Sequence, residues 1–338
     1  MAPCLNLESR KMGILTRCCF ACIAICGCKD ILTRSVAFYP PKSPTYSVHY
    51  TEETPNFYLV TKGKEDHLPP ELPWLQISFL FLTTSQRNRI PVLHVQHTSS
   101  NFTVIFSHGN STDLGGIYNY ILDFATFLGV SVLVYDYSGY GYATGKPSEK
   151  NIFADIRAVY DYALKELGIP WNKVVLYGHS IGTACSCDLA SEMPVGGIVL
   201  QSPMASGYRI IASRLQKSPW FDIFRNIDKA PNIRAPVFLI HGTDDTDIPI
   251  EHSESLLKNF YMPCEPWWVQ GANHENIETE FRRELYERVK KFLGVLEGLY
   301  NLFPIESLLK ELAPCEMSTT KTKDNSDIII KEIHEQTQ

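Results

Sequence analysis

The sequence lacks an excess of positive charge. Its 31 Lys and Arg residues are set against 37 Asp and Glu residues, for a net charge of −6. That balance leaves no broad basic face for nucleic acid, so no nucleic-acid partner is expected. An internal repeat, a P-loop, a dinucleotide-binding glycine fingerprint and a metal-ligand spacing are also absent. We therefore expect neither a cofactor nor a metal ion.

Cysteine is scarce beyond the amino terminus. Of the ten cysteines, only Cys185, Cys187, Cys264 and Cys315 lie after residue 28. A disulfide framework would distribute pairs through the fold, so the interior is expected to do without one. The other six cysteines, by contrast, are concentrated in the first 28 residues of the chain: Cys4, Cys18, Cys19, Cys22, Cys26 and Cys28.

Most of this cysteine cluster lies in an apolar run of 11 residues, 18–28, whereas a membrane-spanning helix needs about 20. Residues 1–34 carry five basic and two acidic side chains, a net of +5 − 2 = +3. Two or more acyl chains beside basic residues hold a protein firmly at an anionic membrane, since each buried CH₂ contributes about 0.8 kcal/mol. This favours S-acylation over the alternatives, a secretory signal peptide or a metal or redox role. The candidate acylation sites are Cys18, Cys19, Cys22, Cys26 and Cys28.

The sequence divides into three parts. Residues 1–44 form the cysteine-rich segment and a connector, in which prolines at 40, 41 and 44 exclude regular helix or central strand. Residues 45–297 are expected to form one catalytic domain. Residues 298–338 are expected to be a partly disordered extension, because the sequence beyond Pro314 is largely polar.

Short apolar runs alternate with helical patterns through the middle of the chain. Two alternating segments, 75–83 and 90–97, predict an antiparallel hairpin. The buried-strand runs that follow are 102–107, 130–135, 173–177, 196–201, 236–240 and 266–269, and the helical patterns are 114–128, 148–168, 181–193, 251–260 and 276–293. This alternation predicts an α/β fold with a mostly parallel central sheet and helices on both faces. Segment 202–234, broken by prolines, predicts a small cap of short helices, the alternative being one crossover helix with a long loop.

Residues 174–184 carry the strongest motif. A β-branched apolar run leads into Gly-x-Ser-x-Gly and then into helix-compatible residues, the pattern of a strand, a sharp turn and a helix. The turn would hold Ser180 out on a strained backbone, as a candidate nucleophile. Side chains at Gly178 and Gly182 would collide with the neighbouring strand and helix.

An acid and a base follow this serine, each after a predicted strand. The order Ser180, Asp245, His274 is the one expected of an α/β-hydrolase. Asp244 and Asp247 are alternatives for the acid. For the base, His252 lies in a predicted helix, and His241 is expected to pack at a strand end.

The oxyanion hole is expected to combine two backbone N–H groups. One belongs to Ile181, directly after the nucleophile, and the other most simply to Asn110, in the loop after the strand 102–107. Glycine at 109 allows the main chain to turn toward a substrate.

Together, these motifs resemble the α/β-hydrolase-domain subfamily seventeen, whose members are membrane-anchored protein depalmitoylases with an amino-terminal palmitoylated cysteine cluster. The matching segments are FSHGN at 106–110, DLG at 113–115, YDYSGYG at 135–141, YGHSIGT at 177–183 and HGTDD at 241–245. The resemblance extends from about residue 14 to 293. It implies an α/β-hydrolase fold, a Ser180, Asp245, His274 triad and thioester hydrolysis of S-palmitoyl cysteine on peripheral membrane proteins.

We therefore expect a lipid-anchored serine hydrolase at the cytoplasmic face of the plasma and endosomal membranes. Its substrates would be S-palmitoylated membrane-associated proteins. A carboxylesterase or monoacylglycerol-type lipid hydrolase is the alternative, because pocket shape sets leaving-group preference. A catalytically silent, membrane-recruited interaction module is a third.

Overall fold

The computed structural model describes residues 37–52, 54–59, 72–211 and 219–302. The candidate acylation sites and the chain beyond residue 302 lie outside these ranges, so what was expected of them stays a prediction. Within the described ranges, no helix combines the length and the apolar character needed to cross a bilayer.

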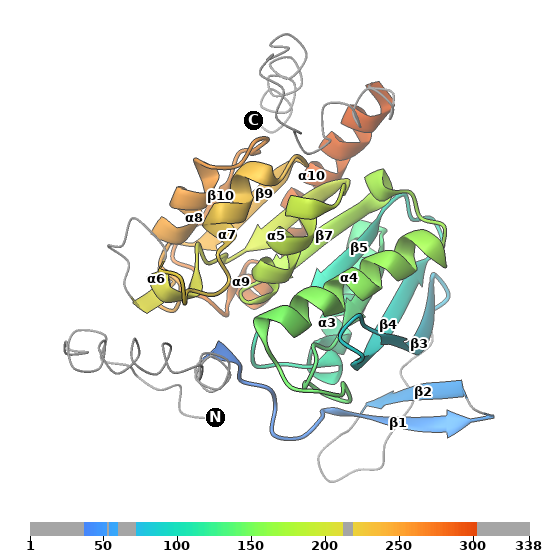
Figure 1. Cartoon of the computed structure of the whole chain (residues 1–338). Coiled ribbons are helices and arrows are strands. Elements are labelled where there is room, and N and C mark those ends of the chain that lie inside the picture. Colours follow the sequence, from blue (N-terminus) through green and yellow to red (C-terminus); the bar gives the residue numbers. More distant parts are fainter. Residues whose placement is uncertain (1–36, 53, 60–71, 212–218, 303–338) are drawn as a thin grey trace, which may run out of the picture.

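The core is an eight-stranded sheet in the order β10-β9-β8-β7-β5-β6-β4-β3 (Figure 1). Its strands are β3 Leu75–Thr83, β4 Arg89–His97, β5 Thr103–Ser107, β6 Ser131–Tyr135, β7 Val174–His179, β8 Gly197–Gln201, β9 Val237–Gly242 and β10 Trp267–Val269. Strand β4 pairs antiparallel with both β3 and β6, and every other pairing is parallel. The predicted fold class, including the antiparallel hairpin at one edge, is confirmed.

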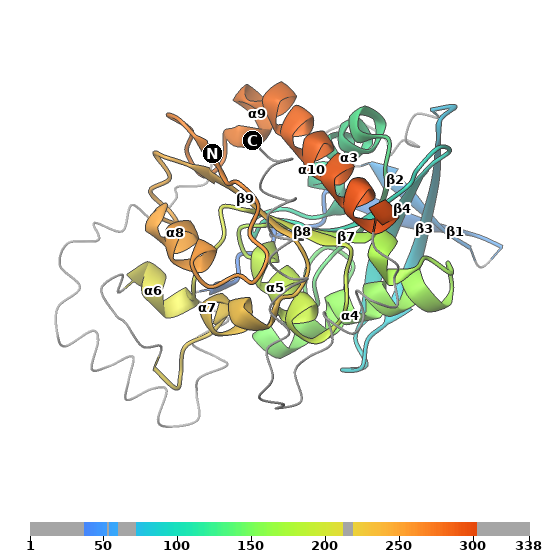
Figure 2. The same cartoon turned by 90° about the horizontal axis from the view of Figure 1, so that it is seen from above.

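Helices cover both faces of this sheet (Figure 2). One face carries α3 Leu114–Leu128, α9 Ile277–Glu280 and α10 Arg282–Leu302, and the other carries α4 Glu149–Lys165, α5 Gly182–Glu192, α7 Asn226–Lys229 and α8 Glu251–Leu257. Alternate residues of one strand therefore enter different cores: Phe106 packs with α3, whereas Ile105 packs with α4 and α5. This is why strands such as β5 and β6 are buried along their whole length.

The predicted helix ends agree closely where the sequence supplies caps. The Asp113 carboxylate accepts from the Gly116 N–H at the start of α3, and Gly129, at φ 67°, ends that helix. Ser148 caps α4 in the same way. The single helix expected over 276–293 is wrong, because the chain forms α9 and then, after Phe281, a separate α10 that continues to Leu302.

A two-stranded hairpin, β1 Tyr46–Thr51 and β2 Thr54–Leu59, precedes the sheet and was not predicted. The two strands pair only with each other. Tyr46 stacks on Phe57, with ring centroids 5.0 Å apart, and its hydroxyl donates to the Asp136 carboxylate at 2.5 Å. The hairpin is thereby attached to the loop that follows β6.

Short helices occupy the described part of the predicted cap. They are α6 Gly207–Ile211, α7 and the 3₁₀ turn η2 Ala230–Asn232, and another 3₁₀ turn, η1 Trp171–Lys173, precedes β7. The regular structure within residues 202–211 and 219–234 thus consists of short helical pieces, as expected.

Candidate active site

Ser180 lies on the sharp turn between β7 and α5. Its φ is 54°, in the left-handed region that side chains other than glycine rarely adopt. A Cβ on Gly178 would come within 2.6 Å of the Gly182 carbonyl oxygen, and one on Gly182 within 2.0 Å of the Ser107 carbonyl oxygen. The two glycines therefore let the strand, the turn and the helix approach closely, for the steric reason predicted.

The structure brings the three predicted catalytic side chains together. Ser180 follows β7, Asp245 follows β9 and His274 follows β10, so all three lie at the carboxyl edge of the sheet. The Ser180 Oγ lies 2.9 Å from His274 Nε2, and His274 Nδ1 lies 2.8 Å from Asp245 Oδ2. When a hydroxyl, an imidazole and a carboxylate are hydrogen-bonded in this order, a proton can move from the serine to the histidine.

Among the three neighbouring aspartates, only Asp245 contacts the imidazole in the described structure. Its carboxylate is buried, and Oδ1 accepts the backbone N–H groups of Asp247 at 3.0 Å and Ile248 at 2.8 Å. The side chains of Asp244 and Asp247 are exposed, and Asp244 accepts a hydrogen bond from the Thr243 hydroxyl.

The two other candidate histidines have structural partners. His241 is fully buried, and its Nδ1 lies 2.6 Å from the Ser253 hydroxyl. His252 Nδ1 accepts the backbone N–H of Ala205 at 3.0 Å, and burial lowers the pKa of His252 to about 4. Neither imidazole is therefore bonded to Ser180.

The electrostatics of the site favour an ionised acid beside a basic imidazole. Burial alone would raise the pKa of Asp245, but hydrogen bonds from His241 and His274 outweigh it and lower that pKa well below its usual range. Burial alone would lower the pKa of His274. The hydrogen bond and the charge of Asp245 outweigh this effect and raise that pKa above its ordinary value. A negative charge at Asp245 would thus stabilise an imidazolium at His274 if that residue took a proton from Ser180.

The predicted oxyanion donors lie in the turn that carries the serine and in the loop after the neighbouring strand. Ile181 directly follows it, and the loop containing Asn110 follows β5, the strand next to β7. A Cβ on Gly109 would come within 3.3 Å of His179 Nδ1, so this loop packs against the residue preceding the nucleophile. Among the described residues, the backbone N–H groups of Asn110 and Ile181 have no protein acceptor. Both N–H groups therefore remain candidates for binding a substrate oxygen.

A pair of half-buried polar side chains near His274 was not predicted. His179 Nδ1 lies 3.5 Å from the Glu278 carboxylate, and the His179 and His274 rings lie 5.7 Å apart. Burial and the nearby His274 lower the pKa of His179 to about 3, so this imidazole is neutral. Burial raises the pKa of Glu278 to about 7, although a hydrogen bond with Gln201 opposes the rise. The only sequence signal was position: His179 precedes Ser180, and Glu278 follows His274 by four residues.

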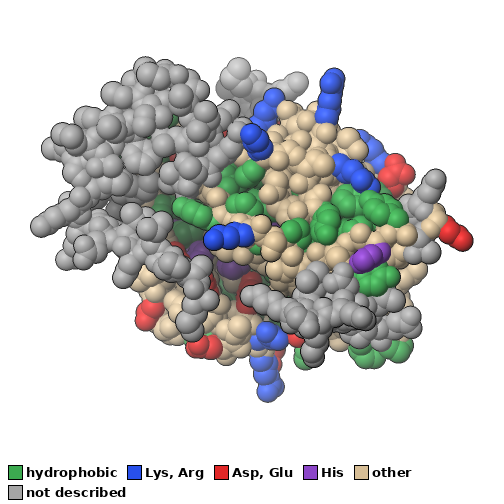
Figure 3. Space-filling view, turned by 90° about the horizontal axis from the view of Figure 1, so that it is seen from below, with side chains coloured by type: hydrophobic (Ala, Val, Ile, Leu, Met, Phe, Trp, Pro, Cys, Tyr) green, Lys and Arg blue, Asp and Glu red, His purple; other side chains and the backbone are tan. Residues whose placement is uncertain are grey.

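The carboxyl edge of the sheet faces the lower side of Figure 1. From that side, histidine and acidic side chains come to the surface between apolar patches (Figure 3). Ile210, Trp220 and Tyr39 are among the exposed apolar side chains of the molecule.

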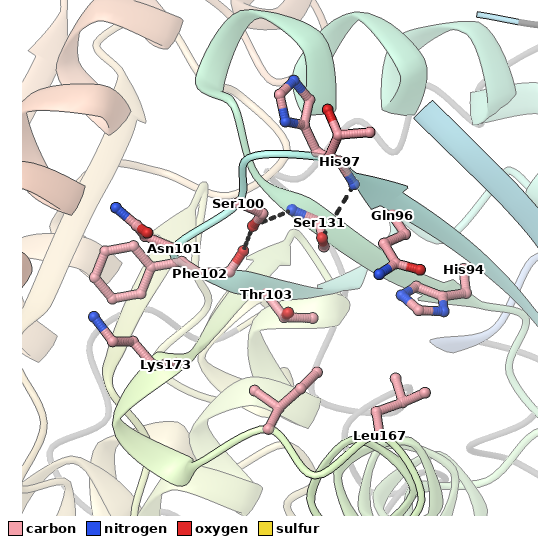
Figure 4. A pocket seen from close by; sticks show the side chains of 12 residues that line it. His94, Gln96, His97, Ser100, Asn101, Phe102, Thr103, Ser131, Leu167 and Lys173 are labelled. Carbon is pink, nitrogen blue, oxygen red and sulfur yellow. Dashed lines mark hydrogen bonds between the residues drawn. The ribbon is translucent and has the colours of Figure 1, made fainter. Parts of the chain in front are cut away.

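A polar depression lies at the opposite edge of the sheet, where β5, β6 and β7 begin. His97 donates its N–H to the Ser131 hydroxyl, and Ser131 donates its N–H to Ser100, both within this depression (Figure 4). It is separated from Ser180 by the length of the strands, so it belongs to another face of the molecule.

The three described cysteines, Cys185, Cys187 and Cys264, are buried and form no disulfide.

The comparisons with known proteins agree with this geometry. The family model described as "alpha/beta hydrolase fold" matches residues 103–222. The chain is 37% identical over 286 residues to alpha/beta hydrolase domain-containing protein 17B of Xenopus laevis, covering 84% of this chain and 97% of that protein. It is 36% identical to the 17B protein of Homo sapiens with the same coverage, and 36% identical to alpha/beta hydrolase domain-containing protein aho-3 of Caenorhabditis elegans, covering 82% of each chain.

Solved structures support the fold. The Pyrococcus furiosus esterase Pf2001 aligns with a TM-score of 0.56 at 20% identity, covering 76% of this chain and 98% of the esterase. Est1E from Butyrivibrio proteoclasticus, solved with ferulic acid bound, aligns with a TM-score of 0.53 at 18% identity, covering 63% and 97%. With an α/β-hydrolase sheet, a serine on its strained turn and relatives at this identity over most of their length, the chain belongs to the family of the alpha/beta hydrolase domain-containing 17 proteins.

Proposed function

We propose that this protein is a serine hydrolase that removes S-palmitoyl groups from membrane-associated proteins through an acyl-serine intermediate. The hydrolase proposal rests on the continuous hydrogen bonding from Ser180 through His274 to Asp245. Ser180 itself lies on the strained turn after β7. The assignments of nucleophile, base and acid to these residues are part of this proposal.

In the first half-reaction, the Ser180 Oγ attacks the thioester carbonyl carbon while His274 Nε2 takes the hydroxyl proton. The oxygen of the tetrahedral intermediate receives hydrogen bonds from the N–H groups of Ile181 and Asn110. The carbon–sulfur bond then breaks, and His274 returns the proton to the departing cysteine sulfur. The acyl group is left as an ester on Ser180.

In the second half-reaction, water attacks the acyl-serine carbonyl. His274 accepts a proton from that water and then donates it to the Ser180 oxygen as the ester bond breaks. Fatty acid leaves and the free serine is regenerated. Asp245 keeps its charge throughout and maintains the imidazole tautomer that both steps need.

The thioester assignment is supported by two features of the chain. One is the resemblance of its motifs to the α/β-hydrolase-domain subfamily seventeen, a resemblance that implies protein depalmitoylation. The other is the run of candidate acylation sites at residues 18–28 beside basic residues, which would keep the enzyme at the membrane where acylated proteins reside. We propose a peripheral, lipid-anchored location at the cytoplasmic face of the plasma and endosomal membranes.

A substrate panel tests this assignment. Full-length protein is incubated with an S-palmitoyl peptide, the matched O-palmitoyl serine peptide and a monoacylglycerol, and released fatty acid is measured. We expect the thioester to have the highest kcat/KM and Ser180→Ala to abolish release. Undiminished release by Ser180→Ala contradicts the mechanism, and preference for either oxygen ester favours the carboxylesterase or lipid hydrolase.

Ser186→Ala is the matched control for that substitution. Ser186 is buried in α5, and its hydroxyl has no hydrogen-bond partner among the described residues, so its loss should leave turnover unchanged. A fluorophosphonate probe provides a further readout. Failure of Ser180 to react with it in folded protein would support the catalytically silent alternative.

A further inference from the structure

The side chain of Asn110 is bound to a segment far away in the sequence. Its Oδ1 accepts the backbone N–H of Tyr39 at 3.0 Å, and its Nδ2 donates to the backbone carbonyl of Ala37 at 2.9 Å. The Tyr140 hydroxyl donates to the same Oδ1 at 2.6 Å. One amide thus joins residues 37–39 to the loop after β5 and to the loop after β6.

The residue between these two backbone contacts is buried in the protein. Phe38 is only 4% exposed and packs edge-on against Phe224, with ring centroids 5.7 Å apart. Phe224 is also buried and has a φ of 51°, and its N–H donates to the Glu149 carboxylate at 2.6 Å at the start of α4. Residues 37–39 therefore contact the cap as well as the oxyanion loop, at the lower side of Figure 1.

This arrangement bears on catalysis because the backbone N–H of Asn110 is one of the two proposed oxyanion donors. Such donors act by being held in place before charge develops, and a displacement of about 1 Å can cost two orders of magnitude in rate. Gly109 has no side chain to hold the loop, and His179 packs on one side of it. The Asn110 amide supplies further support, through residues 37–39 and Tyr140.

We propose that residues 37–39 are a positioning segment for the oxyanion hole, with Phe38 and the Asn110 side chain as its two attachment points. The connector that follows the candidate acylation sites is then part of the active-site scaffold as well as a link to the membrane. This inference rests on the proposed hydrolase function and does not depend on which acyl substrate is preferred.

The first test is Phe38→Ala in the full-length chain. Loss of the contact with Phe224 should loosen the segment, so kcat should fall about tenfold while KM changes little. The inhibition constant of an alkyl boronic acid, which forms an anionic tetrahedral adduct with a serine, should rise by a similar factor. Phe38→Leu keeps an apolar side chain at this position, so it should retain most of the wild-type kcat and most of the wild-type affinity for the boronic acid.

A second variant addresses the other attachment point. Asn110→Asp keeps the shape and the acceptor for Tyr39 and Tyr140 but loses the donor to the Ala37 carbonyl. We expect kcat to fall by several-fold and boronic acid affinity to weaken with it. If Phe38→Ala misfolds, this near-isosteric variant still decides the question, because wild-type kcat and affinity in Asn110→Asp overturn the proposal.

Phe102→Ala is the matched control. Phe102 is equally buried, at 4%, but lies at the opposite edge of the sheet from Ser180. It should lower the thermal midpoint comparably and leave kcat within about twofold of wild type. An equal loss of kcat in Phe38→Ala and Phe102→Ala would show a general effect of instability and contradict the positioning role.

The comparison is made on whichever ester or thioester the wild type cleaves, since the same oxyanion hole serves both. A wild type that prefers oxygen esters therefore contradicts the depalmitoylase assignment and leaves this test intact. If the wild type cleaves none of them, the boronic acid affinities of the variants still decide the positioning role.

Discussion

At the scale of single residues, the site depends on how Asp245 is held. Two backbone N–H groups bind one of its oxygens, and His274 binds the other, so the carboxylate stays ionised although it is buried. Its charge raises the pKa of His274 above the ordinary value. Because His274 must be neutral to act as a base, kcat/KM should increase as the pH rises through this raised pKa.

We expect Asp245→Asn to lower kcat by about four orders of magnitude, since an amide neither stabilises the imidazolium nor keeps the required tautomer. The pKa of His274 should fall with the loss of the negative charge, so the remaining activity should extend to lower pH. A kcat/KM profile from pH 5 to 9 measures both effects. Asp244→Asn, at an exposed aspartate, is the control, and a loss smaller than tenfold in Asp245→Asn would contradict the assignment of the acid.

Glu278 adds a second influence on the pH profile. Its pKa of about 7 means that it ionises across the working range, near His274. In Glu278→Gln this charge is absent, so the pKa of His274 should decrease and the acidic limb of kcat/KM should move down by roughly half a pH unit. The plateau at high pH should stay within about threefold of wild type.

The control for this substitution is Glu280→Gln, at an exposed position of the same short helix. An acidic limb that does not move in Glu278→Gln, or that moves equally in Glu280→Gln, shows that the charge of Glu278 does not reach the base.

These residues also show how far sequence could predict the site. The order of serine, acid and histidine, each after a different strand, identified the residues that the structure places together. Choosing among Asp244, Asp245 and Asp247 needed the backbone N–H groups that bind one carboxylate. Glu278 could not be found, because its place beside His179 depends on packing between segments that are far apart in the sequence.

At the scale of elements, the turn between β7 and α5 is held by close approach of main chains. In Gly182→Ala, the new methyl group would overlap the carbonyl oxygen of Ser107 at the end of β5. We expect the free energy of unfolding to decrease by about 3 kcal/mol or more, and the reactivity of Ser180 with a fluorophosphonate to fall. Thermal denaturation followed by circular dichroism measures the first effect.

Gly294→Ala provides the opposite control. Gly294 is exposed in α10, and a Cβ there meets nothing within 4 Å. The substitution should stabilise the protein by about 0.5–1 kcal/mol, because alanine is the better helix former. A Gly182→Ala protein as stable as wild type would mean that the turn does not need this close contact.

The elements that were predicted well are those with a strong local signal. Strands of the central sheet are almost continuously apolar, and α3 and α4 begin at side-chain caps. The hairpin β1–β2 lacks such a signal, since its attachment through Tyr46 joins residues 90 positions apart. The division of the last helical segment at Phe281 was also hidden, because the apolar spacing continues across it.

At the scale of the whole molecule, the proposed membrane location depends on the cysteines of the amino terminus. Replacing Cys18, Cys19, Cys22, Cys26 and Cys28 by serine should move the protein from the membrane to the soluble fraction and abolish hydroxylamine-sensitive acyl labelling. Cys187→Ala is the control, since burial raises the pKa of that thiol to about 12 and keeps it unreactive. A mature chain that begins after residue 28 would instead indicate a cleaved signal peptide.

The contact between Asn110 and residues 37–39 would also limit how far the oxyanion loop can lie from the membrane surface. From Cys28 to Ala37 the chain advances 37 − 28 = 9 residues, and an extended chain spans at most about 3.3–3.6 Å per residue. An acyl chain on Cys28 would therefore keep the oxyanion loop within roughly 30 Å of the lipid surface. This maximum distance from the lipid surface is about equal to the thickness of the hydrocarbon core of the bilayer. A substrate cysteine that lies farther from the membrane than this distance would be cleaved only if insertion of its own acyl chain into the bilayer returned it to the membrane surface.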